Sequence, residues 1–264
     1  GLVGTMALNL LPADMANVWK VTISICLSAA AGVLYSSLLA FSAINLKADQ
    51  TIGGTALNLL STAIALVVAK RYNGSQSAKL SYDNSPFIFQ IGGLTVNVFL
   101  IIGLVLLAIS IVLLYKTRFG LRLQACGEHP QAADSVGINV YKMRWAGVLI
   151  SGLLGGLGGI VYITCGVSEW KFENGVAGFG FLSLAVMIFG QWKPIRIALA
   201  ALLFGAFRAL SNVYFGFDFL MALNIPGPIY NMMPYIISLV VLAFTSKKSR
   251  APKAEGIPYD KGQR

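Results

Sequence analysis

The sequence has few charged residues: Asp, Glu, Lys and Arg make up 11% of its 264 residues. A soluble domain carries roughly 25% of them, so this chain has too little charge to cover a surface that faces water. A soluble enzyme is all but excluded on this ground. A disordered chain is excluded as well, because 56% of the residues are apolar and disorder requires low hydrophobicity. With a mean hydropathy of +0.73, the composition predicts a membrane protein with several crossings.

Residues that serve metal and acid–base chemistry are also scarce. His129 is the single histidine, and Cys26, Cys126 and Cys165 form no CxxC pair, which argues against a zinc site or a disulfide framework. No GxxxxGK[ST] motif occurs, so we do not expect this chain to cradle the phosphates of ATP. We therefore predict no catalytic residue, no metal site and no cofactor in this chain.

Long apolar runs mark the predicted membrane spans, each of which needs about 20 mostly apolar residues. Clear runs lie at 21–44, 52–69, 98–115, 145–165 and 195–214, and weaker ones at 177–190 and 228–245. Residues 1–11 read as the end of a further apolar helix, so we expect the chain to begin inside a longer protein. The predicted fold class is all-α, a polytopic transmembrane helical bundle with about seven crossings.

The distribution of Lys and Arg predicts the orientation of these crossings. If the C-terminal residues are cytoplasmic, fourteen cations fall on the cytoplasmic side and five on the outer side, with Arg208 inside a span. Cytoplasmic loops of membrane proteins carry such an excess. We therefore expect a transmembrane domain at 1–245 with a cytoplasmic loop at 117–144, followed by a basic cytoplasmic tail at 246–264. The net charge of +10 then reflects topology, and no nucleic-acid partner is expected.

Small residues recur every four positions within 145–165. Ser151, Gly155 and Gly159 form one row, and Gly152 and Gly156 form a second. In lipid, such rows allow the backbones of two helices to approach closely. We expect a tight helix–helix contact here.

The loop at 117–144 contains the signals of a short helix of its own. Pro130 suits the first position of a helix and Gly137 suits its end, which predicts about two turns over 130–136. A helix this short is marginal by itself in water. The small side chains of Ala132 and Ala133 indicate that it inserts into a groove on a partner, and an ordinary solvated loop is the alternative.

This loop also resembles a known family. The run GLRLQACGEHPQAADSVGINVYKMR at 120–144 resembles the cytoplasmic coupling segment of bacterial ABC-importer permeases for branched-chain amino acids, simple sugars and nucleosides. The likeness continues at 146–159, 178–185 and 189–194. The segments LKADQ at 46–50 and GTALN at 54–58 are similar to the nucleoside and simple-sugar branch in particular.

The resemblance implies a subunit of the bacterial inner membrane that has no ATPase of its own. ATP would be bound by partner ATPase subunits, a second permease subunit would complete a hetero-dimer, and an extracytoplasmic substrate-binding lipoprotein would deliver the substrate. Closure of the ATPases would push the short helix as a lever and rock the bundle. The residues expected to contact an ATPase are Gly127, Glu128, Pro130, Ala132, Ala133, Asp134 and Gly137. An Ala133→Arg substitution is expected to block transport and docking without affecting membrane insertion.

Two polar residues within the spans are candidates for the substrate path, because polar groups in lipid are costly. Asn58 could bind a sugar hydroxyl, or could form an interhelical hydrogen bond. Arg208 could meet a substrate oxygen, extend to the membrane interface, or pair with Asp218.

A transporter that works without ATP is the rival interpretation. Ion-coupled carriers place carboxylates within their spans, and none of the ten Asp and Glu residues lies in the runs at 21–44, 52–69, 98–115 or 145–165. The sequence therefore predicts an ATP-driven importer of nucleosides or simple sugars, with branched-chain amino acids as the alternative substrate.

Overall fold

The computed structural model describes residues 1–12, 14–74, 77–91, 93–165, 169–175, 178–213 and 251–262, together with scattered residues between 216 and 243. The chain divides into two compact units. Unit 1 comprises Gly1–Val176 and Lys253–Arg264, and unit 2 comprises Ala177–Pro252.

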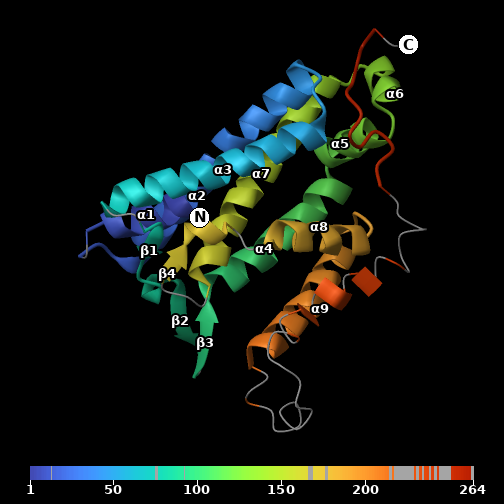
Figure 1. The fold of residues 1–264 in the computed structure, drawn as a ribbon. Helices are drawn as coiled ribbons and strands as arrows, with labels where there is room; N and C mark the ends of the chain where they lie inside the picture. The colour runs from blue at the N-terminus through green and yellow to red at the C-terminus, as the bar shows by residue number, and fades with distance from the viewer. Residues whose placement is uncertain are drawn as a thin grey trace. The chain divides into compact units, whose positions relative to one another are not determined.

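Helices dominate the order of elements along the chain (Figure 1). In unit 1 the elements are α1 (Leu2–Leu10), α2 (Asn17–Ala40), the π-helix η1 (Phe41–Asn45), α3 (Gln50–Asn73), β1 (Lys79–Ser81), η2 (Ser85–Phe87), β2 (Ile88–Ile91), β3 (Leu94–Asn97), α4 (Val98–Lys116), α5 (Arg118–Glu128), α6 (Pro130–Ser135), α7 (Val140–Thr164), β4 (Glu169–Lys171) and η3 (Phe172–Asn174). Unit 2 contains α8 (Phe179–Phe189) and α9 (Pro194–Val213).

Four helices of the described residues are long and apolar enough to cross a membrane: α2 together with η1, and α3, α4 and α7. They coincide with the predicted spans at 21–44, 52–69, 98–115 and 145–165. The other three predicted spans are not among them. Helix α8 has 11 residues and is about 16 Å long, about half the thickness of the bilayer core. Helix α9 carries Arg196 and Arg208, and half of the residues of 228–245 lie outside the described residues.

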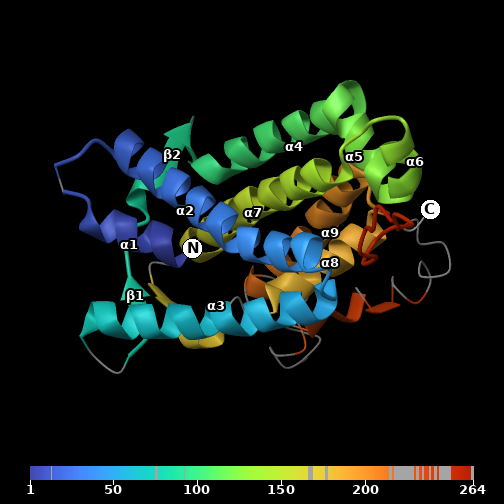
Figure 2. The ribbon, with the colours of Figure 1, turned by 90° about the horizontal axis from the view of Figure 1, so that it is seen from above.

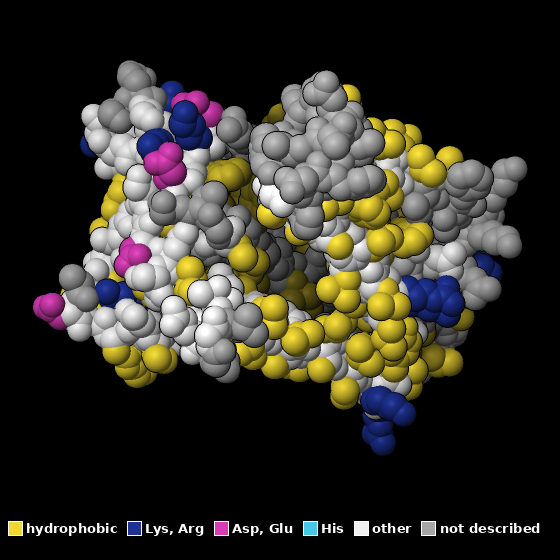
Figure 3. All heavy atoms as spheres, turned by 90° about the horizontal axis from the view of Figure 1, so that it is seen from below, with side chains coloured by type: hydrophobic (Ala, Val, Ile, Leu, Met, Phe, Trp, Pro, Cys, Tyr) yellow, Lys and Arg dark blue, Asp and Glu magenta, His cyan; other side chains and the backbone are white. Residues whose placement is uncertain are grey.

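The surfaces of these helices are apolar. Large hydrophobic side chains are exposed along α2, α3 and α4, and on the face drawn in Figure 3 hydrophobic side chains are widespread while Lys and Arg gather in separate patches. An exposed apolar surface of this extent suits contact with lipid or with another protein. The chain is thus a helical membrane protein, as the composition predicts.

Glycine brings α2 and α7 into backbone contact, and the two helices lie side by side in Figures 1 and 2. A methyl group on Gly32 would lie 2.2 Å from the carbonyl oxygen of Gly152, and one on Gly156 would lie 2.3 Å from that of Ser28. The predicted tight contact is confirmed for the row of Gly152 and Gly156. In the other row, nothing lies within 4 Å of the position that a methyl group on Gly155 would take.

Helix α1 packs against both α2 and α7. A methyl group on Gly4 would lie 2.2 Å from the Ser28 hydroxyl oxygen and 2.6 Å from the Ile160 side chain. Thr5 is fully buried, and its hydroxyl donates to the carbonyl oxygen of Leu2 at 3.0 Å. This hydroxyl therefore needs no partner outside its own helix, which suits an apolar contact between helices.

Two small antiparallel sheets join the ends of the helices, and the sequence analysis does not anticipate them. Strand β1 pairs with β4 so that Leu80 lies opposite Trp170, while β2 and β3 form a hairpin. The β1–β4 sheet is anchored to α7 by Tyr82, whose hydroxyl donates to the carbonyl oxygen of Ile163 at 2.5 Å. Lys79 and Glu169 form an ion pair across the strands. The all-α class thus holds for the spans but not for these connections.

The loops predicted to be cytoplasmic lie together at one end of unit 1. Trp145 Nε1 at the start of α7 donates to Asn45 Oδ1 at the end of η1 at 3.0 Å. Lys47, in the connection to α3, pairs with Asp260 at 3.1 Å. The two sheets occupy the opposite ends of these helices (Figure 1). Within unit 1, the 117–144 loop, the connection at Lys47 and the 253–260 segment therefore lie at the same end, and their orientation in the membrane stays a prediction.

In unit 2, α8 and α9 pack against each other around a core of their own. Leu182 and Val186 of α8 pack against Ala200 and Phe204 of α9. The turn between the helices contains Gln191 and Trp192 with φ of 52° and 57°, a left-handed backbone that is uncommon outside glycine.

Candidate functional site

The 117–144 loop starts with a tight turn that sets α5 against the end of α4. The Thr117 hydroxyl accepts from the backbone N–H of Gly120 at 3.1 Å and donates to the carbonyl oxygen of Leu113 at 2.6 Å. A methyl group on Gly120 would lie 2.1 Å from that same carbonyl oxygen. Gln124 Nε2 adds a hydrogen bond of 2.8 Å to the carbonyl oxygen of Leu114. These contacts fix the direction in which α5 leaves the membrane helix.

The predicted short helix is present as α6, with Pro130 as its first residue. Gly137 ends it with φ of +83°. The N–H of Gly137 bonds the carbonyl oxygen of Asp134 at 2.9 Å, and the N–H of Ile138 bonds that of Ala133 at 3.0 Å. This pair of bonds is the Schellman motif, which satisfies carbonyl groups at a helix end. The helix is therefore terminated by its own sequence, as predicted.

The seven residues predicted to contact an ATPase differ in their exposure to solvent. Glu128, Ala132 and Gly137 are exposed, Gly127 and Asp134 are half-buried, and Pro130 and Ala133 are buried. Ala133 is only 3% exposed, so it faces the inside of the loop rather than a groove on a partner. An Ala133→Arg substitution would therefore disrupt the packing of the loop itself, and the expected loss of transport and docking with normal membrane insertion stays a prediction. The exposed apolar residue beside Ala132 is Val136, at 75% exposure.

A small hydrophobic cluster packs against the buried face of α6. Ala133 packs with Cys126 of α5, Val140 of α7 and Tyr259. Burial raises the pKa of the Cys126 thiol, against a smaller opposing effect of the Arg144 charge, so the thiol stays protonated at neutral pH. The sequence analysis misses Tyr259, which it assigns to a basic tail. The available signal is the apolar run of Ile257, Pro258 and Tyr259 within that charged stretch.

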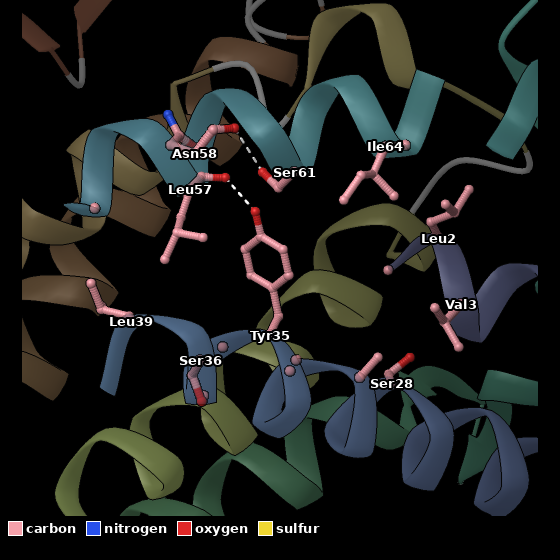
Figure 4. Close-up of a pocket in the computed structure, with 18 residues that line it drawn as sticks. Leu2, Val3, Ser28, Tyr35, Ser36, Leu39, Leu57, Asn58, Ser61 and Ile64 are labelled. Carbon is pink, nitrogen blue, oxygen red and sulfur yellow. Dashed lines mark hydrogen bonds between the residues drawn. The ribbon is translucent and has the colours of Figure 1, made fainter. Parts of the chain in front are cut away.

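A cavity of about 580 Å³ lies between α1, α2, α3 and α7 (Figure 4). Its walls are mostly apolar, with Tyr35 and Ser36 of α2 and Asn58 and Ser61 of α3 as polar members. Tyr35 points from α2 toward α3, where its hydroxyl donates to the carbonyl oxygen of Leu57. The cavity thus combines an aromatic ring, hydroxyl groups and one amide in an apolar setting, which is the usual make-up of a ligand pocket.

Asn58 lines this cavity, as its proposed role in the substrate path requires. Its backbone carbonyl oxygen accepts from the hydroxyls of Ser61 at 2.8 Å and Thr62 at 3.2 Å. Its side-chain amide makes no hydrogen bond with the residues that the structure describes, and Asn58 is an exposed residue of α3. The role in the substrate path and the interhelical hydrogen bond both stay predictions.

Arg208 belongs to α9 of unit 2 and is not among the residues lining this cavity. Its guanidinium carbon lies 5.3 Å from the centre of the Phe179 ring of α8, within the range of a cation–π interaction. Asp218, the partner considered above, lies outside the described residues. The structure therefore gives Arg208 a contact that holds α8 and α9 together.

No group of three or more His, Cys, Asp or Glu residues that could hold a metal ion occurs within the described ranges.

The comparisons with known proteins agree with this architecture. The family described as "Branched-chain amino acid transport system / permease component" matches residues 1–244. The chain is 39% identical to the nucleoside ABC transporter permease protein NupC of Lactococcus lactis over 273 residues, which cover 100% of this chain and 85% of NupC. It is also 39% identical to the guanosine ABC transporter permease protein NupQ of Bacillus subtilis, with 92% of this chain and 78% of NupQ covered.

More distant relatives include the putative glucose ABC transporter permease protein TsgC13 of Haloferax volcanii, at 28% identity over 92% of this chain and 80% of that protein. No solved structure matches the chain. The family match covers the membrane helices, the 117–144 loop and the cavity alike. The resemblance found at 120–144 therefore extends over residues 1–244. On this evidence the chain belongs to the permease components of the branched-chain amino acid transport system family.

Proposed function

We propose that this chain is a permease subunit of an ATP-driven importer that moves nucleosides across the bacterial inner membrane. The observation that carries the proposal is the 39% identity, over the whole of this chain, to a nucleoside permease. Four long apolar helices and a polar loop with a self-terminated helix suit a transport subunit. A simple sugar is the second candidate substrate, because the chain is also similar to a putative glucose permease.

We place the 117–144 loop and the C-terminal residues in the cytoplasm, with seven crossings in the chain. This orientation is supported by the excess of Lys and Arg in these loops and by the ion pair of Lys47 with Asp260 at the same end of unit 1. Unit 2 would then supply the remaining crossings, with the short helix α8 as part of a broken span of the kind that transporters use.

The partner at the exposed face of α6 would be an ATPase subunit, since the chain carries no phosphate-binding loop. Ala132 and Val136 present a small and an apolar side chain to that partner, and Glu128 presents a charge. A second permease subunit and an extracytoplasmic binding lipoprotein complete the proposed importer. Coupling requires that α6 contact the ATPase differently in the two states of the bundle.

The nucleoside would pass by the cavity between α2, α3 and α7. A volume of about 580 Å³ falls within the range of roughly 300–1,000 Å³ that ligand pockets occupy. The Tyr35 ring can stack on a base, because every base has an aromatic face. The Asn58 amide, which has both donors and an acceptor, can bind ribose hydroxyls or a base edge.

Uptake and co-purification together test this function. Cells or liposomes containing the complex purified through this chain should accumulate labelled guanosine only when ATP is present, with labelled ribose and leucine as competing substrates. An ATPase subunit with a phosphate-binding loop should co-purify. Uptake without ATP, or a complex without an ATPase subunit, would refute the proposal. Preferential uptake of ribose or leucine would show that the substrate is a sugar or a branched-chain amino acid instead of a nucleoside.

Two matched pairs of variants test whether the substrate passes by the cavity and whether the ATPase binds at α6. Gly155→Leu would fill the cavity and should abolish uptake, whereas Gly158→Leu lies outside the cavity on the same helix and should not. Ala132→Arg should prevent co-purification of the ATPase, while Ala132→Ser keeps a small side chain and should retain it.

A further inference from the structure

The 253–260 segment folds back onto the 117–144 loop. The backbone N–H of Ala254 donates to the carbonyl oxygen of Gly127 at 2.9 Å. Arg144 Nη1 donates to the carbonyl oxygen of Ile257 at 2.9 Å, and the Tyr141 hydroxyl donates to the carbonyl oxygen of Tyr259 at 3.5 Å. These bonds are made with main-chain groups of the 253–260 segment. They therefore fix the path of its backbone over α5 and the start of α7, and do not depend on a single side chain of the segment.

The Tyr259 ring is the anchor of this contact. It is 5% exposed and packs with Ala133, Cys126 and Val140. The Tyr141 ring meets it edge to face at 5.3 Å, and the Arg144 guanidinium carbon lies 6.0 Å from its centre. An aromatic side chain buried against another ring and a cation is held by dispersion and by its quadrupole. The ring therefore fills the space beneath the inner face of α6.

The next residue extends the contact to a third part of unit 1. Asp260 pairs with Lys47 at 3.1 Å, and Lys47 lies between η1 and α3 with φ of +52°. Both side chains are partly exposed, so this pair contributes modestly by itself. Its position matters more than its strength, because it ties the 253–260 segment to the connection between η1 and α3.

Helix α6 is too short to keep its place by its own hydrogen bonds. It has 6 residues, and isolated helices below about 12–15 residues are marginal in water. Its buried face consists of small side chains, so the Tyr259 ring supplies most of the apolar bulk against which Ala133 rests. A push on α6 reaches α7 along the chain. From there it can reach the α2–α3 connection by the Trp145–Asn45 hydrogen bond, and the 253–260 segment adds a second route through the ion pair of Asp260 with Lys47.

From these contacts we propose that the 253–260 segment is a clamp in which Tyr259 and Asp260 act as positioning residues, holding α6 so that its displacement moves both α7 and the α2–α3 connection. This inference rests on the proposed function, in which α6 receives the stroke of an ATPase. It goes beyond that function by assigning the clamp to residues that need not touch the ATPase or the substrate. The expected consequence of losing the clamp is ATP hydrolysis with little transport.

The test compares variants in the complete complex, reconstituted in liposomes, by measuring guanosine accumulated per ATP hydrolysed. Tyr259→Ala removes the ring and should lower this ratio on the order of tenfold, the scale of a typical coupling free energy. Tyr259→Phe keeps the ring and should restore it. Ile257→Ala is the matched control, because this side chain is 57% exposed and its carbonyl group is retained.

Two further measurements distinguish positioning from damage to the fold. Cys126 is buried against Tyr259, so Tyr259→Ala should make its thiol react faster with a maleimide while the ATPase still co-purifies. Asp260→Asn changes a partly exposed side chain, should fold normally and should lower the ratio, and the exchanged pair Lys47→Glu with Asp260→Lys should recover it.

The outcomes are distinct. If Tyr259→Ala and Asp260→Asn both transport as much guanosine per ATP as the unaltered chain, the clamp is refuted while the importer stands. If the exchanged pair fails to recover a loss seen in Asp260→Asn, the role of that ion pair is refuted. If the unaltered chain brings down no ATPase and needs no ATP, the proposed function itself has failed.

Discussion

The backbone contact between α2 and α7 allows a prediction in which two nearly identical substitutions have different effects. A methyl group on Gly156 would lie 2.3 Å from the carbonyl oxygen of Ser28 and 3.1 Å from the α-carbon of Ala29. Nothing lies within 4 Å of the position that a methyl group on Gly158 would take. Gly156→Ala and Gly158→Ala therefore add the same atoms to the same helix, and only the first forces α7 away from α2.

The magnitude follows from this geometry. Replacing glycine by alanine within a helix favours the helix by about 1 kcal/mol, and this gain is common to both variants. Overpacking a tight contact costs typically 1–3 kcal/mol, and the obstructing atoms here belong to the backbone of α2, which cannot rotate aside. We therefore expect the free energy of unfolding of Gly156→Ala to be about 1–3 kcal/mol lower than that of Gly158→Ala.

Thermal unfolding of the purified chain in detergent, followed by tryptophan fluorescence, measures this difference. At roughly 2–4 °C per kcal/mol for a chain of this size, Gly156→Ala should melt several degrees below Gly158→Ala. Equal melting temperatures would show that the two helices do not meet through their backbones, and the argument for a glycine-mediated contact would fail.

Three further predictions concern the connections. Tyr82→Phe removes the buried hydrogen bond to the carbonyl oxygen of Ile163 and should lower the free energy of unfolding by about 1 kcal/mol; an unchanged melting curve would contradict this. Gly137→Ala places a side chain at φ of +83°, which costs about 1–2 kcal/mol, and should increase protease cleavage near the end of α6, whereas Gly137→Asn should be milder. Backbone N–H groups of α3 lower the pKa of the Asp49 carboxyl, so its capping contribution is present above the ordinary Asp pKa and is lost as the pH falls through the lowered value. Asp49→Asn should remove that acid-dependent step from the melting temperature, and persistence of the step would assign it to another group.

The helices that cross the membrane could be predicted from local composition, because each must satisfy its backbone hydrogen bonds within itself in lipid. The four long spans therefore lie where the apolar runs place them. The β2–β3 hairpin has a local signal in Gly92-Gly93 between its strands, but the β1–β4 sheet could not be predicted in this way. Leu80 and Trp170 are far apart in the chain, and a three-residue strand has no periodicity that would distinguish it from a loop.

The residues of the candidate sites also differ in how far the sequence alone could predict them. Pro130 and Gly137 define the ends of α6 through their own backbone preferences, so both are visible in the sequence. The inward direction of Ala133 is not visible, because Ala132 and Ala133 are identical residues and only the packing beneath α6 distinguishes them. Asn58 is a candidate on polarity alone, and its place in the lining of the cavity depends on how α2 and α3 lie.

By itself the sequence determined that this is a helical membrane protein of a permease family, since apolar length, charge placement and helix end signals act over neighbouring residues. Only the tertiary structure decided which glycine row meets α2, which residues surround the cavity, and what supports α6. Those features depend on side chains that are distant along the chain, such as Tyr141 and Tyr259, which are 118 residues apart. Local preferences carry no information about such pairs, and packing alone brings them together.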